Sequence, residues 1–191
     1  MSKKVAIARA LSILGHPGVV MPAALMVMSR QVGSAANAAL FVALGVTALV
    51  VLYSLWQVRR GAWAHVDASQ RPERLQLNRF VGAVLLASSA LAWLNGALAL
   101  ALGLVASASL LLMALALQRR CKLSLHVGFA CLAAGLMWPN AVALGLGALL
   151  ASGVAWSRLV LQRHVPRDLW VGAAAGSLAV LVVHWTLPRL Q

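Results

Sequence analysis

Long apolar runs, separated by short polar segments, make up most of the 191 residues. These runs are apolar on every face, whereas a membrane β-strand alternates apolar and polar positions over about 10 residues. A helix needs about 20 consecutive apolar residues to cross a bilayer, and fewer if the bilayer thins. The pattern therefore predicts an all-α, polytopic membrane helix bundle.

Seven apolar runs are long enough to be considered as helices, and six would cross if one hairpin is re-entrant. They cover residues 10–29, 36–57, 80–94, 97–118, 123–138, 141–156 and 169–187. The dipeptides Asn95-Gly96 and Pro139-Asn140 predict tight turns between neighbouring runs. No polar stretch is long enough for a soluble domain, so residues 1–191 are expected to form a single membrane domain.

The composition indicates that lipid, rather than water, surrounds most of the chain. Hydrophobic residues make up 62% of the chain and charged residues 10%, against roughly half and a quarter in soluble domains. The first apolar run is too long for a signal peptide and lacks a clear cleavage site, so we interpret it as a retained helix. Cys121 and Cys131 would lie at different depths, which disfavours a disulfide.

The charge is strongly one-sided, with 16 Lys+Arg against 3 Asp+Glu. The basic residues lie between apolar runs, which indicates contact with anionic lipid headgroups rather than with nucleic acid. In a seven-helix arrangement all of them except Arg30 and Arg189 fall on one membrane face. That face also receives the polar segments 59–79, 119–123 and 157–168, and the positive-inside rule places it in the cytoplasm.

The last polar segment contains candidate catalytic residues. His164 and Asp168 are four residues apart and would share one face of a helical turn. A carboxylate beside an imidazole fixes its tautomer and stabilises its positive form. Arg158 offers a planar fork that suits phosphate oxygens, and Ser157 adds a hydroxyl. A His-Asp pair alone is more typical of an ordinary surface loop, but Arg158 and a second histidine, His126, on the same face favour catalysis.

These residues resemble the signatures of the type 2 phosphatidic acid phosphatase superfamily over about residues 59–175, the predicted phosphatase motif region. The third signature, Ser-Arg-x5-His-x3-Asp, is matched without a gap from Ser157 to Asp168. Of the second, Pro-Ser-Gly-His, Ser124 and His126 are retained. Of the first, Lys-x6-Arg-Pro, only Arg71-Pro72 is found, with Arg71, Arg74 and Arg79 as a divergent basic set.

The resemblance implies phosphoryl transfer in two steps, without a metal or another cofactor. His164 would attack phosphorus and form a phosphohistidine, Asp168 would orient His164, and His126 would protonate the leaving alkoxide and then activate water. The resemblance also implies a set of groups that bind the phosphate oxygens: Lys122, Ser124, Ser157, Arg158 and one or both of Arg71 and Arg74. Phosphoryl transfer is catalysed mainly by such positioning and charge stabilisation.

We therefore expect an integral-membrane phosphatase of a bacterial inner membrane that acts on a lipid phosphate or diphosphate. A lipid phosphotransferase and a non-catalytic transporter or scaffold stay open as alternatives. Retention of both histidines and Asp168 favours an enzyme, because a scaffold needs none of them. His16 and His184, within the first and last apolar runs, are expected to hydrogen-bond inside the bundle. Nothing in the pattern indicates an oligomeric state.

Overall fold

The computed structural model describes residues 2–31, 36–66, 68 and 70–190. Within these ranges the chain forms α-helices and no strand, which confirms the all-α prediction. The helices are α1 (Lys3–Leu14), α2 (Pro17–Gln31), α3 (Ala36–Arg59), α4 (Arg71–Leu94), α5 (Leu98–Leu117), α6 (Leu125–Leu136), α7 (Ala141–Val160) and α8 (Pro166–Leu190).

By length and composition, α3, α4, α5, α7 and α8 can each cross a membrane. The predicted run 10–29 is not one straight helix, because α1 and α2 meet at an angle of 46°. Pro17 begins α2, where its missing N–H and fixed φ are tolerated. Counted as one bent span, α1 and α2 bring the described chain to six candidate spans, which is the lower predicted number.

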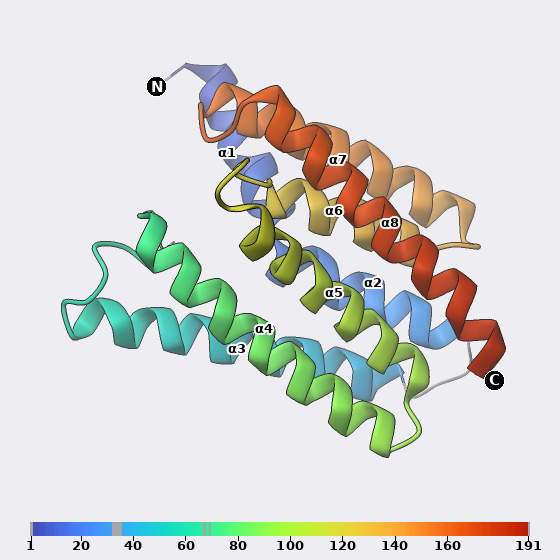
Figure 1. Ribbon diagram of the computed structural model, residues 1–191. Coiled ribbons are helices and arrows are strands. Elements are labelled where there is room, and N and C mark those ends of the chain that lie inside the picture. The colour runs from blue at the N-terminus through green and yellow to red at the C-terminus, as the bar shows by residue number, and fades with distance from the viewer. Residues whose placement is uncertain (1, 32–35, 67, 69, 191) are drawn as a thin grey trace.

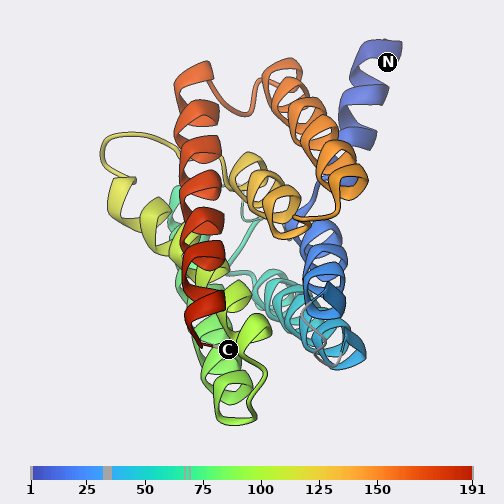
Figure 2. The same ribbon diagram turned by 90° about the vertical axis from the view of Figure 1, so that its right-hand side faces the viewer.

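Where a helix was predicted over residues 123–138, the structure has the shorter helix α6, which is only 12 residues long. That length is well short of what a bilayer requires. It lies in the centre of the bundle, where it packs against α2, α5, α7 and α8 (Figure 2). Its apolar composition therefore suits burial among other helices, and by its length α6 is not counted among the candidate spans.

The two ends of the bundle collect different connectors. The left-hand end in Figure 1 holds the N-terminus and the α3–α4, α5–α6 and α7–α8 connectors. The opposite end holds the α4–α5 and α6–α7 turns and the C-terminus. Gly96, in the first of these turns, has a φ of +72°, which suits glycine. This arrangement matches the predicted gathering of the polar segments at one end.

Two helix boundaries differ from prediction. Helix α4 begins at Arg71, within the segment 59–79 that was expected to be a polar connector. The side chain of Glu73 accepts hydrogen bonds from the backbone N–H groups of Ala64 and Gln70, which stabilises this early start. Helix α7 continues to Val160, so the α7–α8 connector is residues 161–165 rather than 157–168.

Candidate active site

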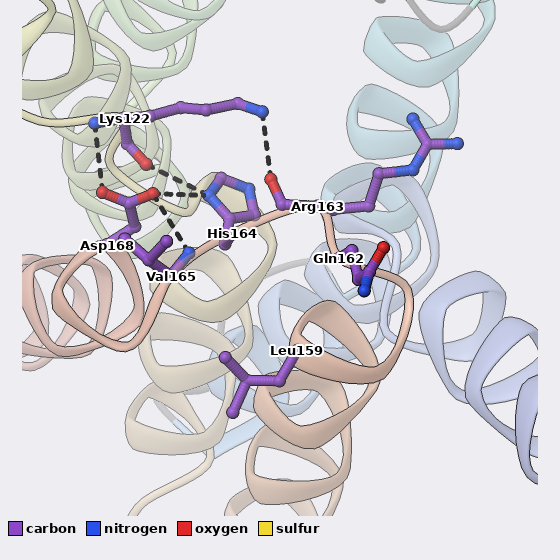
Figure 3. A pocket seen from close by; sticks show the side chains of 7 residues that line it. All are labelled: Lys122, Leu159, Gln162, Arg163, His164, Val165 and Asp168. Atoms are coloured by element: carbon purple, nitrogen blue, oxygen red, sulfur yellow. Dashed lines mark hydrogen bonds and ion pairs between the residues drawn. The ribbon is translucent and has the colours of Figure 1, made fainter.

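His164 and Asp168 meet where the connector enters α8. His164 Nδ1 lies 3.4 Å from Asp168 Oδ2 and 3.1 Å from the carbonyl oxygen of Lys122 (Figure 3). Both neighbours accept hydrogen bonds, so Nδ1 carries the proton of the neutral ring. His164 Nε2 then keeps its lone pair, on the side of the ring that faces away from Asp168.

Asp168 holds together the segments that build the site. Its side chain is buried in the first turn of α8, where the helix dipole favours a negative charge. Asp168 Oδ1 accepts from the Lys122 N–H at 3.2 Å, and Oδ2 accepts from the Val165 N–H at 3.5 Å. The Asp168 carbonyl accepts from the Ser124 N–H at 3.1 Å. The α5–α6 connector is thereby fastened to α8.

The electrostatics of the site favour a neutral His164. Burial lowers the pKa of His164 below its ordinary value, and the positive charges of Lys122 and Arg158 lower it further. The hydrogen bond that His164 donates to Asp168 acts in the opposite direction but does not cancel these effects. An unprotonated imidazole is the form that can act as a nucleophile.

Arg158 and Ser157 lie in the last turn of α7 rather than in the connector. Arg158 Nη1 donates a hydrogen bond to Ser12 Oγ of α1 at 2.8 Å. Ser157 is fully buried, and its hydroxyl donates to the Val154 carbonyl of its own helix at 2.7 Å. The structure therefore places Arg158 beside α1, while the Ser157 hydroxyl is engaged within α7.

Ser124 immediately precedes α6 and His126 lies in its first turn, close to Asp168 and Lys122 in the folded chain. Ser124 is fully buried, and among the described residues its Oγ has no hydrogen-bond partner. Such a hydroxyl costs free energy unless a ligand or water satisfies it. The His126 ring stands edge-to-face against His16, with ring centroids 5.4 Å apart and an interplanar angle of 79°.

The two candidate arginines of α4 differ in position. Arg71 is exposed at the first turn, whereas Arg74 is half-buried one turn later. Partial burial lowers the pKa of Lys122, and the nearby positive charges of Arg74 and Arg158 lower it further. The structure thus brings Arg74 into electrostatic range of the site, and no described contact links Arg71 to it.

A pocket of about 370 Å³ opens beside the nucleophile candidate (Figure 3). It is lined by Lys122, Leu159, Gln162, Arg163, His164, Val165 and Asp168. Lys122 Nζ donates to the Arg163 carbonyl at 3.0 Å on this surface. No group of three or more His, Cys, Asp or Glu side chains in the described part of the chain is arranged to hold a metal ion.

Sequence reasoning missed two residues of the first span. His16 was expected to hydrogen-bond within the bundle, and its Nδ1 does accept from the Gly18 N–H at 3.1 Å. Its ring, however, also contacts His126, and Ser12 contacts Arg158. The available signal was His16-Pro17, a polar and helix-breaking dipeptide inside an apolar run. For His184 the expectation is confirmed, since its Nε2 lies 2.9 Å from the Gly135 carbonyl.

Comparison with known proteins finds a partial similarity. The phosphatidylglycerophosphatases B of Escherichia coli K12, E. coli O157:H7 and Shigella flexneri are each 42% identical to the chain over 64 residues. The match covers 32% of this chain and 25% of each relative, so it spans about a quarter of their length. No family model and no solved structure matches. The chain is therefore similar, over part of its length, to a phosphatase.

Proposed function

We propose that this protein is an integral-membrane phosphatase of the type 2 phosphatidic acid phosphatase superfamily that hydrolyses a lipid phosphate or diphosphate. The observation that carries the proposal is the environment of His164. Its Nδ1 lies between two acceptor oxygens, which leaves Nε2 as a free nucleophile. The signature resemblance and the partial similarity to phosphatidylglycerophosphatase B support the same reaction class.

The first step transfers the phosphoryl group to the protein. His164 Nε2 attacks phosphorus, and an N–P bond forms as the P–O bond to the lipid breaks. The electron pair leaves with the lipid oxygen, which takes a proton from His126. His164 becomes positively charged in this step, and the Asp168 carboxylate beside Nδ1–H stabilises that charge.

The second step releases phosphate. His126 takes a proton from water, the water oxygen attacks phosphorus, and the N–P bond breaks to return His164 to its neutral form. Lys122, Arg158 and Arg74 offset the charge on the phosphate oxygens, and the Ser124 hydroxyl donates a hydrogen bond to one of them. The unsatisfied burial of Ser124 Oγ supports this role. These phosphate contacts are predictions, as are those from Ser157 and Arg71.

The test is phosphate release by the purified protein in vesicles. Phosphatidylglycerophosphate, phosphatidic acid and a polyprenyl diphosphate would be supplied separately, with a chelator of divalent cations present. The wild type is expected to release phosphate from at least one of them, and His164→Asn to abolish release. His184→Asn, the same substitution at a histidine of α8 that contacts the Gly135 carbonyl away from the site, should retain activity.

Two outcomes would contradict the proposal: no release from any of these lipids, or release that His164→Asn leaves unchanged. Dependence of the rate on added divalent cation would contradict the metal-free mechanism. Appearance of the phosphoryl group on an added alcohol, in place of free phosphate, would identify the phosphotransferase alternative.

We also propose that the protein lies in a bacterial inner membrane with its site on the cytoplasmic side. This rests on the basic residues of the connectors that gather at one end of the bundle. Cys121, a free and half-buried thiol beside Lys122, offers a direct probe. In a Cys131→Ser variant, a membrane-impermeant thiol reagent added to intact cells should leave Cys121 unlabelled until the membrane is permeabilised. Efficient labelling of intact cells would place the site outside.

A further inference from the structure

The break between α1 and α2 lies against the C-terminal half of α7. A methyl group on Gly15 would overlap the Val154 side chain, so only glycine allows this approach. A methyl on Gly153 would be 3.4 Å from the Leu11 side chain, in ordinary contact. Small residues on both sides therefore let α1 and α7 pack closely beside the proposed active site.

Two residues of the first span reach two groups of the proposed site. Ser12 and His16 are four residues apart in sequence. Ser12 Oγ accepts a hydrogen bond from Arg158, and the His16 ring stands edge-to-face against His126. The proposed phosphate-binding arginine and the proposed proton-transfer histidine thus both have a neighbour on α1 or at the α1–α2 break.

The His16 ring is itself held in place. Its Nδ1 accepts from the Gly18 N–H in the first turn of α2, as an N-terminal cap does. Gly18 in turn lies against α3, because a methyl there would be 2.9 Å from Thr47 Cγ2. A ring fixed at Nδ1 and packed at 79° to His126 restricts the orientations that the His126 ring can adopt.

We propose that His16 is a positioning residue for the phosphatase reaction: its ring fixes the orientation of the His126 imidazole for proton transfer. This inference rests on the proposed function. His16 acts through His126, so its loss affects the rate of the bound complex rather than lipid binding. Misplacement of a proton-transfer group by about 1 Å can cost about 10²-fold in rate, and we expect roughly a tenth of that loss here.

Two substitutions separate the ring contact from the helix cap. His16→Asn retains an acceptor for the Gly18 N–H but removes the ring that contacts His126. His16→Phe retains a ring against His126 but removes the acceptor. The inference predicts that His16→Asn lowers kcat about 10-fold with KM unchanged, whereas His16→Phe retains most of the wild-type kcat and loses thermal stability through the missing cap.

His184→Asn is the matched control and should retain wild-type kcat. The opposite pattern, in which His16→Asn is as active as the wild type and His16→Phe is impaired, would show that His16 only caps α2 and would overturn the inference. Equal kcat values for the two variants would also overturn it. If the wild-type protein releases no phosphate from any lipid, the proposed function is overturned, and this inference is overturned with it.

Discussion

Helices α6 and α8 contact each other through their backbones, whereas α3 and α4 contact each other through large side chains. A methyl group on Gly172 of α8 would be 2.5 Å from the Ser124 carbonyl oxygen, and one on Gly176 would overlap the Gly128 carbonyl. On the α3–α4 hairpin, by contrast, Tyr53 and Phe80 stack at 3.8 Å between ring centroids. Apart from the adjoining backbone of α4, no described atom lies within 4 Å of a methyl group placed on Gly82.

This difference follows what each region contributes to the site. The α6–α8 contact sets the distances from Asp168 to Lys122 and Ser124, which must hold to within about an ångström. The α3–α4 hairpin contributes the charge of Arg74, which acts over a longer distance. Backbone contact is thus found where geometry matters, and adaptable aromatic packing where a charge suffices.

The largest expected effect comes from adding a methyl group to the α6–α8 contact. Gly176→Ala forces α8 away from the Gly128 carbonyl, and overpacking of this kind costs typically 1–3 kcal/mol of stability. Separation of α6 from Asp168 should lower phosphate release about 100-fold. Gly82→Ala on α4 is the matched control and should leave activity unchanged. Equal activity of the two variants would remove the proposed difference between the regions.

The pH dependence of kcat/KM is expected to shift in opposite directions in two variants. Burial and Lys122 lower the pKa of His164, which keeps the nucleophile unprotonated as the pH falls. Lys122→Gln removes a lowering charge, so the pKa of His164 rises and the acidic limb moves to higher pH. Asp168→Asn removes the partner that raises this pKa, so the acidic limb moves to lower pH and the maximal rate falls.

Arg60→Gln controls for the loss of one positive charge, because Arg60 stacks on Trp56 at the C-terminal end of α3 and is not among the charges that lower the pKa of His164. Its acidic limb should coincide with that of the wild type. Shifts in the same direction for Lys122→Gln and Asp168→Asn would contradict the assignment of His164 as the titrating nucleophile.

A smaller effect is expected for the arginines of α4. Arg74→Gln should raise KM for the lipid phosphate about fivefold, because an exposed or partly buried charge contributes on the order of 1 kcal/mol. Arg71→Gln, three residues away and exposed, should leave KM within twofold. Steady-state kinetics over a range of lipid mole fractions would measure both. A larger rise in KM for Arg71→Gln than for Arg74→Gln would indicate that Arg71, in the Arg71-Pro72 dipeptide of the first signature, contacts the phosphate instead.

The smallest functional effect is expected within the aromatic packing of the hairpin. Phe80→Leu removes the stack on Tyr53 and should lower stability by about 0.5–1.5 kcal/mol. Since this packing sets no distance within the site, kcat/KM should stay unchanged. Thermal unfolding in detergent and the phosphate assay would be read together, and a loss of kcat/KM without loss of stability would contradict the account.

Much of the fold is predictable from hydropathy, because apolar runs and the turn at Asn95-Gly96 are local properties of the chain. Two features of the fold cannot be predicted from hydropathy. Apolar residues suit lipid and a protein interior equally well, so the buried 12-residue α6 cannot be told from a spanning helix. The His16-Pro17 dipeptide signals a break in the first helix, but the 46° angle of the bend also depends on how Gly15 packs against α7, which no local pattern records.

In the candidate site, too, some contacts can be predicted from the sequence and others cannot. The spacing of His164 and Asp168 predicts their contact, since four residues separate them. The hydrogen bonds that Asp168 accepts come from the backbone N–H groups of Lys122 and Ser124, which almost every residue carries, and so leave no sequence signal. The Ser12–Arg158 hydrogen bond joins residues 146 positions apart, and only the packing of α1 on α7 brings them together.

The most direct test of the central claim is to locate the phosphoryl group on the protein during turnover. The protein would be quenched in alkali while it hydrolyses a lipid whose phosphate carries radioactive phosphorus. After digestion, each labelled histidine would be examined to find which imidazole nitrogen carries the phosphate. The orientation of His164, with Nδ1 held by Asp168 and Lys122, predicts phosphate on His164 Nε2. Phosphate on Nδ1, or on any residue other than His164, would contradict it.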